Sequence, residues 1–269
     1  MYKEDCSADT KDTNCQVTDE ISGYRGKDNQ NMVTQIESVL IKSKNRVRMH
    51  GEVFTPQWVV DMMINIPRIK EKTEDVFATF LEPSAGEGVF LLAIESLKLQ
   101  FVTDNYSTDT WNAYALWALS SIYGIEFLED NLTVARENML MLFSNYYKGV
   151  HNKPLSKQNN IYKSAQAIIW ANVVQGNTLT CKNQYSEEIT FSHWSRIPGD
   201  FGKVQRIPFT YSSLFDSERY EKINMKDCLL GTDEQVGHNH ISSLQCAIVD
   251  IEQVWKEGKS ECLTHLSSM

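Results

Sequence analysis

The spacing of apolar and polar residues predicts helices that alternate with short strands between residues 50 and 177. Apolar runs bounded by turn residues predict strands at 78–82 and 122–126. Apolar residues three and four apart predict helices at 88–100, 110–121 and 130–147, the last with Asp130 as its N-cap, and 164–177 is typical of a helix end followed by a strand. This alternation predicts βαβ units and therefore a doubly wound α/β domain, with a mostly parallel sheet covered on both faces.

The segments outside this region carry weaker patterns. Helical spacing recurs at 32–43 and after Pro56, which suits the first turn of a helix because its missing N–H would have no partner there. Residues 188–197 and 203–211 flank "PGDFG" and predict a β-hairpin with a loop of about five residues, and one helix is expected within 243–258. We expect 1–30 to be a mobile segment, 31–215 the main domain, and 216–269 a C-terminal appendage.

The charge balance limits the ways in which the chain could contact a nucleic acid. The 269 residues carry a formal net charge of −9, whereas a dedicated nonspecific nucleic-acid binder is normally basic. Contact would have to come from a local patch, and two segments qualify. The first is 42–48, with four basic residues, and the second is the hairpin, where Arg196, Lys203 and Arg206 lie among aromatic residues. The alternative for each is a solvated or structural face, with Trp194 in the core.

Cysteine usage and hydropathy indicate a cytoplasmic protein. The six cysteines are too widely spread for a disulfide framework, and no apolar run approaches the ~20 residues that cross a bilayer. The polar N-terminus lacks the apolar region of a secretory signal, so we expect reduced thiols and no membrane contact. The tail contains H-x-H and C-x-x-H pairs but no C-x₂-C spacing, so we expect no metal site.

The loop after the first strand, "EPSAGEG" (82–88), is the main candidate for ligand binding. Ligands bind beyond the carboxyl ends of parallel strands, where Gly86 and Gly88 would let the backbone approach closely and helix N–H groups attract anions. The G-x-G spacing disfavours pyrophosphate, which requires G-x-G-x-x-G. Glu126 ends the second strand and could accept hydrogen bonds from two ribose hydroxyls. Its alternative is a surface glutamate that caps the next helix.

Four segments together carry a resemblance to a known family. In order along the chain they are "HGEVFTPQWVVDMM", "FLEPSAGEGVFLLAI", "YGIEFLEDNLTVARENM" and "NVVQGNTL". They resemble the cofactor half of S-adenosylmethionine-dependent adenine-N6 DNA methyltransferases of bacterial restriction–modification systems, over about residues 48–180. The resemblance implies a class I methyltransferase (Rossmann-like) fold for 31–215, S-adenosylmethionine as the cofactor, and DNA as a partner.

The resemblance also implies which residues bind the cofactor. These are Phe54, Thr55, Pro56, Glu82, Pro83, Ala85, Gly86, Gly88, Glu126, Phe127 and Asn177. Within this set, 54–56 would line the methionine end, and the 82–88 loop would surround the methionine amino and carboxyl groups. Glu126 matches the ribose-binding acid and Phe127 the residue against the adenine ring. Asn177 replaces the usual Asp that accepts from the adenine amino group, a role that its carbonyl oxygen can still perform.

The catalytic motif of the family is absent from the sequence. That motif, Asp/Asn/Ser-Pro-Pro-aromatic, supplies two acceptors for the target amine and a ring that stacks on the flipped base. None of the six prolines is adjacent to another. Asn183 or Ser192 could supply an acceptor and Trp194 or Tyr185 a stacking face, although no spacing supports them, so the catalytic residues stay unassigned.

The leading hypothesis is therefore an S-adenosylmethionine-binding protein of the DNA adenine-N6 methyltransferase type. The alternatives are a catalytically incomplete subunit that depends on a partner chain, and a methyltransferase of a different substrate.

Overall fold

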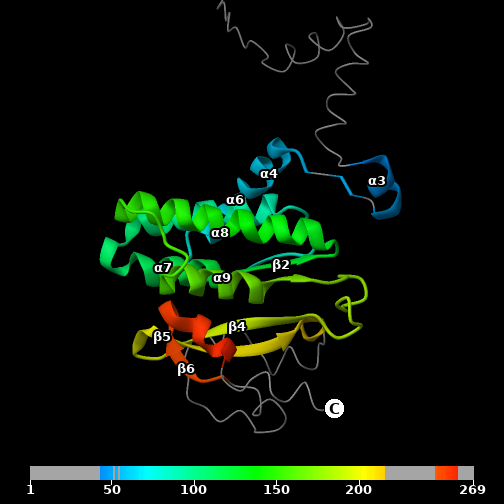
Figure 1. Ribbon diagram of the computed structural model, residues 1–269. Helices are drawn as coiled ribbons and strands as arrows, with labels where there is room; N and C mark the ends of the chain where they lie inside the picture. Colours follow the sequence, from blue (N-terminus) through cyan, green and yellow to red (C-terminus); the bar gives the residue numbers. More distant parts are fainter. Residues whose placement is uncertain (1–42, 51, 54, 216–245, 260–269) are drawn as a thin grey trace, which may run out of the picture. The chain divides into compact units, whose positions relative to one another are not determined.

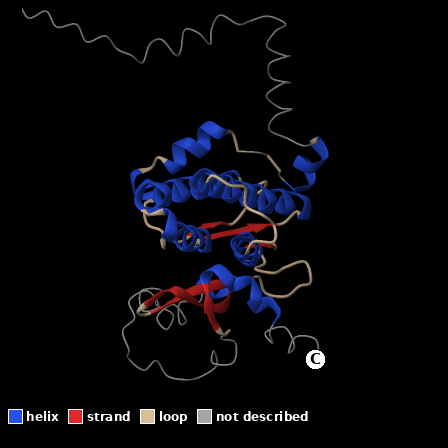
Figure 2. Cartoon of the chain, turned by 60° about the vertical axis from the view of Figure 1, so that its left-hand side comes forward, coloured by secondary structure: helices blue, strands red, loops and turns tan. Residues whose placement is uncertain are grey.

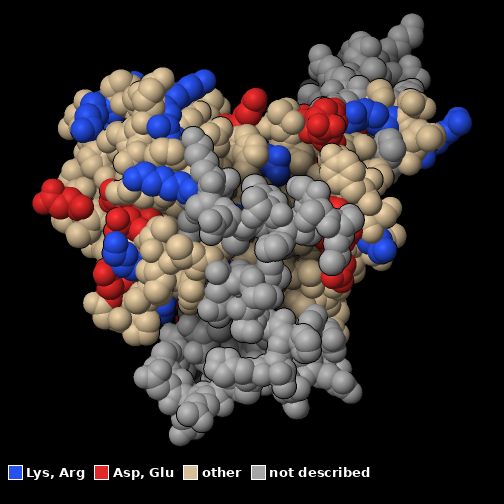
Figure 3. Space-filling model, turned by 60° about the horizontal axis from the view of Figure 1, so that its bottom comes forward, with Lys and Arg blue, Asp and Glu red and all other residues tan. Residues whose placement is uncertain are grey.

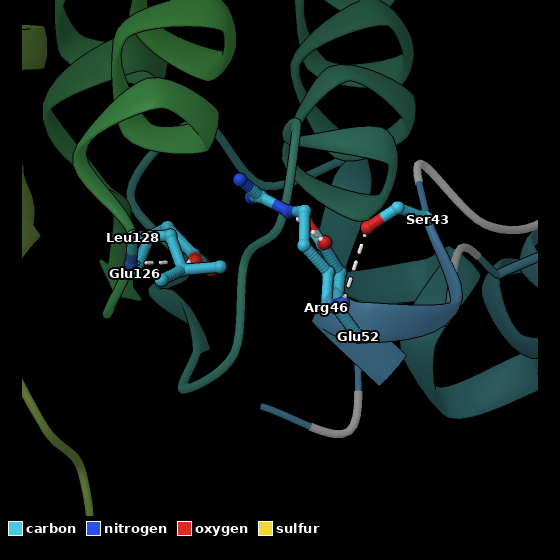
Figure 4. Close-up of polar contacts among 5 residues, drawn as sticks. All are labelled: Ser43, Arg46, Glu52, Glu126 and Leu128. Carbon is cyan, nitrogen blue, oxygen red and sulfur yellow. Dashed lines mark hydrogen bonds and ion pairs between the residues drawn. The ribbon is translucent and has the colours of Figure 1, made fainter. Parts of the chain in front are cut away.

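The computed structural model describes residues 43–50, 52, 53, 55–215 and 246–259. The chain divides into two compact units, Met1–Pro56 and Gln57–Met269. The predicted mobile segment 1–30, residues 32–42 of the predicted helix 32–43, and the histidine pairs of the tail lie outside the described residues, and Ser43 precedes helix α3. In the first unit, helix α3 (Lys44–His50) presents Arg46, whose guanidinium makes a bidentate ion pair with Glu52 (Figure 4).

The second unit contains the predicted alternation of helices and strands. Two short helices, α4 (Gln57–Ile64) and α5 (Pro67–Thr73), precede strand β1 (Phe80–Glu82). Helices α6 (Val89–Asn105) and α7 (Thr108–Ser120) lead to β2 (Ile122–Glu126), and α8 (Glu129–His151) and α9 (Asn160–Asn172) lead to β3 (Val173–Gln175). The strand at 122–126 thus has its predicted bounds.

The three strands form a parallel sheet in the order β1-β2-β3, with Glu82 opposite Gly124 and Glu126 opposite Gln175. Helices α6 and α8 cover one face of this sheet, and α7 and α9 lie on the other (Figures 1 and 2). This arrangement confirms a parallel sheet with helices on both faces, limited to three strands in the described chain. The strand ends that carry the candidate ligand-binding residues lie together at the carboxyl edge.

A separate antiparallel sheet follows the parallel one. Strands β4 (Thr190–Ile197) and β5 (Asp200–Thr210) form the predicted hairpin, but Pro198 and Gly199 alone separate them, so the loop is shorter than the predicted five residues. Gly199 has a φ of 80°, which permits this tight connection. The helix predicted within 243–258 is confirmed in part: β6 (Ile248–Asp250) pairs with β5, and a 3₁₀ helix, η2 (Ile251–Lys259), follows it with an interruption at Gln253.

One hydrophobic core joins the helical layers to the second sheet. Trp111, Trp117 and Phe143 of the helices are fully buried and share a cluster with Trp194 of β4 and Val254 of η2. The described part of the predicted appendage, 246–259, therefore packs into the same core as α7 and α9. No described helix is long and apolar enough to span a membrane.

Two ionisable side chains are buried on helix α6. The Lys98 ammonium donates to the carbonyls of Asp75 (2.7 Å) and Val76 (3.1 Å), and burial lowers the pKa of Lys98 to about 7. Glu95 is 1% exposed and neither carboxyl oxygen has a hydrogen-bond partner among the described residues, so burial raises its pKa well above 4.5. Both groups lie on the helix that starts at the glycine loop.

Candidate functional site

One backbone hydrogen bond joins the loop after β1 to the end of β2, and a second closes the loop itself. The Ala85 N–H donates to the Ile125 carbonyl at 2.9 Å, and the Gly88 N–H donates to the Ala85 carbonyl at 2.8 Å. Gly86 and Gly88 have φ values of 56° and 89°, in the left-handed region that glycine adopts at little cost. The two glycines therefore give the loop a compact turn at the start of α6.

The two glycines occupy different surroundings. A Cβ added at Gly86 would meet no heavy atom within 4 Å, so this position borders open space. A Cβ at Gly88 would lie 3.0 Å from the Ala135 Cβ of helix α8 and 3.2 Å from its Cα. Both glycines were expected to let a ligand approach. Only Gly86 borders open space, because Gly88 lies in close contact with helix α8.

The Glu126 carboxylate links the glycine loop to the next helix. Glu126 is 6% exposed, and its Oε2 accepts from the Gly86 N–H at 2.7 Å. Its Oε1 accepts from the Leu128 N–H at 2.9 Å (Figure 4). Leu128 is the N-cap residue of α8, so Glu126 does contact the next helix, but from a buried position rather than from the surface. A carboxylate has about four acceptor sites. Two therefore remain for ligand hydroxyls.

The side chains next to Glu126 and β1 complete this edge. Phe127 is 53% exposed, and its carbonyl accepts from the Gln175 side chain at 3.2 Å. Glu82 accepts from the Ser84 N–H at 3.1 Å. Burial raises the pKa of Glu82, and this hydrogen bond partly opposes the shift. An aromatic face and two carboxylates thus lie at the ends of adjacent strands.

The segment after β3 is folded back on itself. The Asn177 Oδ1 accepts from the N–H groups of Leu179 (3.0 Å) and Thr180 (3.3 Å), as in an Asx turn. The predicted adenine acceptor therefore already accepts two hydrogen bonds in its own turn. The Thr178 hydroxyl donates to the Pro83 carbonyl and joins this turn to the glycine loop. Sequence reasoning missed Thr178, and nothing in the "QGNTL" pattern distinguishes it.

The predicted cofactor-binding residues 54–56 belong to the first compact unit. Phe54 lies outside the described residues. Thr55 and Pro56 end the first unit, directly before α4 of the second unit. Their predicted place at the methionine end of the cofactor stays a prediction.

Comparison with known proteins identifies the family. The family described as N-6 DNA Methylase matches residues 30–196, which is more than half of the 269-residue chain. Searches of curated proteins and of solved structures gave no match. The chain belongs to the N-6 DNA methylase family. The suspected adenine-N6 DNA methyltransferase type is therefore confirmed at the level of the family, with DNA as the substrate that membership implies.

The candidate acceptors for the methylase reaction are engaged elsewhere. The Asn183 Oδ1 accepts from the N–H groups of Tyr185 (2.9 Å) and Glu187 (3.0 Å). Ser192 is 1% exposed, and its Oγ accepts from the Arg206 Nε at 2.7 Å. Both side chains hold the local structure, so neither presents an acceptor to a target amine.

The aromatic and basic residues of the hairpin are used in packing. Trp194 is 6% exposed with the Arg206 guanidinium 5.7 Å from its ring centre, and Arg196 lies 4.0 Å from the ring centre of Phe77. Lys203 pairs with Asp250 at 3.0 Å. These contacts favour the structural alternative for the hairpin over a stacking platform for nucleic acid, and they confirm Trp194 as a core residue.

The described surface has no broad basic face in the view of Figure 3, where lysines and arginines lie scattered among acidic residues. Within the described residues, no group of three or more His, Cys, Asp or Glu side chains is placed to hold a metal ion. The carboxyl edge of the parallel sheet is therefore the best-supported candidate site for the family's cofactor.

Proposed function

We propose that this member of the N-6 DNA methylase family binds S-adenosylmethionine at the carboxyl edge of its parallel sheet and serves the methylation of adenine N6 in DNA. The observation that carries the proposal is the pairing of Gly86 with Glu126. A backbone turn open to a ligand is held by a buried carboxylate that keeps two acceptor sites. The family match over the same segments supports it.

The predicted roles follow from the chemistry of each group. The remaining acceptor sites of Glu126 would bind the two ribose hydroxyls, and the exposed ring of Phe127 would lie against the adenine. Glu82 and the 82–88 loop would receive the methionine amino group, with Pro83, Ala85 and Gly88 shaping the turn. Thr55, Pro56 and Phe54 would line the methionine end. The chain would position the sulfonium and exclude water, and in-line methyl transfer would need no covalent intermediate.

A second candidate is a subunit that depends on a partner chain for its catalytic acceptors. The engagement of Asn183 and Ser192 in local hydrogen bonds favours it, because neither is available to a target amine. The Asn177 turn adds to this, since the amide expected to accept from adenine already accepts two backbone hydrogen bonds. We place either form in a bacterial restriction–modification system and in the cytoplasm.

Calorimetry with S-adenosylhomocysteine, the demethylated cofactor, tests the proposed site. Gly86→Asn fills the open space beside the loop while tolerating the left-handed backbone, so binding should fall at least tenfold without loss of the fold. Gly149→Asn is the matched control, because Gly149 also borders open space but lies on helix α8. Equal affinity of both variants and the wild type would contradict the assignment.

Methyl transfer separates the two candidates. We expect the purified chain to transfer labelled methyl groups to duplex DNA slowly or not at all, because lost acceptors cost on the order of a hundredfold in rate. Lysate from the native host should restore transfer if a partner supplies them. Efficient transfer by the chain alone would rule out the partner-dependent form.

A further inference from the structure

The turn that follows β3 is joined to the end of β2. The Gly176 N–H donates to the Glu126 carbonyl at 3.0 Å, and the Gln175 side chain donates to the Phe127 carbonyl at 3.2 Å. The next residue along the chain, Asn177, has a partly exposed side chain. A nucleoside with its ribose on Glu126 and its base against Phe127 would therefore have Asn177 close to the edge of the base.

The carbonyl oxygen of the Asn177 side chain is used within the turn. Its Oδ1 accepts from the N–H groups of Leu179 (3.0 Å) and Thr180 (3.3 Å), which occupies both lone pairs of an amide oxygen. Both partners are backbone donors, so the bonded atom must be the oxygen rather than the nitrogen. The Nδ2 group makes no hydrogen bond to the described residues. Asn177 therefore presents a ligand with donors and not with an acceptor.

Further hydrogen bonds hold the turn in this form. The Asn177 N–H donates to the Lys182 carbonyl at 2.8 Å, and the Thr180 N–H also lies 3.2 Å from the Asn177 carbonyl. The Thr178 hydroxyl donates to the Pro83 carbonyl of the glycine loop. Reversal of the Asn177 amide would set its NH₂ group against two backbone N–H donors and would lose both bonds. The turn therefore favours the orientation in which the nitrogen is available.

This orientation matters for the 6-position of a purine. The 6-amino group of adenine is a hydrogen-bond donor, and a site that recognises it must supply an acceptor. The Asn177 NH₂ group would place donor against donor, so no hydrogen bond from Asn177 to the amino group is available. The ribose and the face of the ring have separate partners in Glu126 and Phe127, and these do not depend on Asn177.

We propose that the site recognises a purine nucleoside through its ribose and the face of its base, and does not discriminate at the 6-position. Asn177 is the residue that sets this specificity. The inference rests on the proposed cofactor site and names the ligands that this site admits. These are S-nucleosyl ligands of purines with or without the 6-amino group.

Calorimetry with S-adenosylhomocysteine and its 6-deamino analogue, in which hydrogen replaces the amino group, tests the proposal. The wild type should bind the two ligands within about threefold of each other, because no hydrogen bond is lost with the amino group. Asn177→Asp keeps one oxygen for the turn and replaces the Nδ2 donors by a second acceptor. This variant should prefer S-adenosylhomocysteine by roughly tenfold.

Asn159→Asp is the matched control. The Asn159 Oδ1 also accepts from a backbone N–H, that of Ile161 at 2.8 Å, but it does so at the start of α9 and is not part of the candidate site. The ratio of the two affinities should therefore stay at the wild-type value in this variant.

The outcomes separate the inference from the proposed function. A wild-type ratio near one that rises in Asn177→Asp alone supports the inference. Binding of neither ligand would contradict the cofactor site, and the inference would fall with it. A wild type that binds S-adenosylhomocysteine at least tenfold more tightly than the analogue would keep the cofactor site and overturn the inference, because another acceptor would then serve the amino group. An unchanged ratio in Asn177→Asp, or an equal change in Asn159→Asp, would also overturn the role of Asn177.

Discussion

The carboxyl and amino ends of the parallel sheet belong to the same strands but present different chemistry. At the carboxyl end, the strands pass into turns, and the groups gathered there are the Gly86 backbone amide, the buried Glu126 carboxylate and the exposed Phe127 ring. At the amino end, helix α7 runs almost directly into β2, and large side chains such as Trp117, Tyr123 and Trp194 pack there. The connections thus leave a turn-built candidate site at the carboxyl end and a packed layer of large side chains at the amino end.

Gly88→Ala should have the largest effect on the free energy of unfolding, and the change lies at the carboxyl end of the sheet. The new Cβ would combine a left-handed φ of 89° with a 3.0 Å approach to Ala135. We expect the free energy of unfolding to fall by roughly 2–4 kcal/mol, measured by urea denaturation. Gly149→Ala is the control with the opposite sign, since a helical glycine in open space should gain about 0.5–1 kcal/mol. Equal stability of Gly88→Ala and the wild type would show that α8 can shift away from the new Cβ at little cost in free energy.

Glu126→Ala should weaken ligand binding at the carboxyl end. It removes the acceptors of Gly86 and Leu128 together with the proposed ribose acceptors, so S-adenosylhomocysteine affinity should fall roughly 10- to 100-fold. Glu129→Ala, an exposed neighbour, is the control and should keep the affinity of the wild type. Unchanged S-adenosylhomocysteine affinity in Glu126→Ala would contradict the ribose assignment.

Glu95→Gln should have the smallest effect and probes the helix that joins the two ends. Burial raises the Glu95 pKa above 4.5, so its protonated form contributes stability that is complete below 4.5 and is lost as pH rises toward the raised pKa. The wild type should therefore lose on the order of 1–2 kcal/mol relative to Glu95→Gln between about pH 5 and pH 7.

Urea denaturation at both pH values measures this difference, with the exposed Glu137→Gln as the control. The upper limit of pH 7 avoids the opposing contribution of Lys98, whose lowered pKa of about 7 makes stability rise with pH above that value. A difference between wild type and Glu95→Gln that does not change with pH would contradict a buried, titrating Glu95.

Local periodicity predicted most of the helical and parallel-strand elements, because each carries its own apolar pattern. Strand β2 is the clearest case, since its five residues are buried and bounded by Ser121 and an exposed Phe127. Asp130 was predicted as an N-cap but lies in the first turn of α8, whose N-cap is Leu128. The N-cap and the first turn of a helix both favour an acidic residue, so the sequence alone does not distinguish the two positions.

Features that depend on distant partners were not predicted. The three residues of β6 form a strand only because β5 lies beside them, with Lys203 opposite Asp250. The different roles of Gly86 and Gly88 depend on Ala135, some fifty residues away, and the Asn177 turn depends on hydrogen bonds that a short motif does not encode. The cofactor roles of residues 54–56 remain a prediction. The domain limits 31–215 and 216–269 also remain a prediction.

The Glu126 hydrogen bonds have a kinetic consequence. The chain alone holds the Gly86 and Leu128 backbone in place, so these two positions need no ordering when a ligand arrives at this edge. Association with such a preformed turn would be set by diffusion and orientation, and related ligands would differ mainly in how fast they leave. Residence time, rather than speed of capture, would then distinguish a methyl donor from its demethylated product.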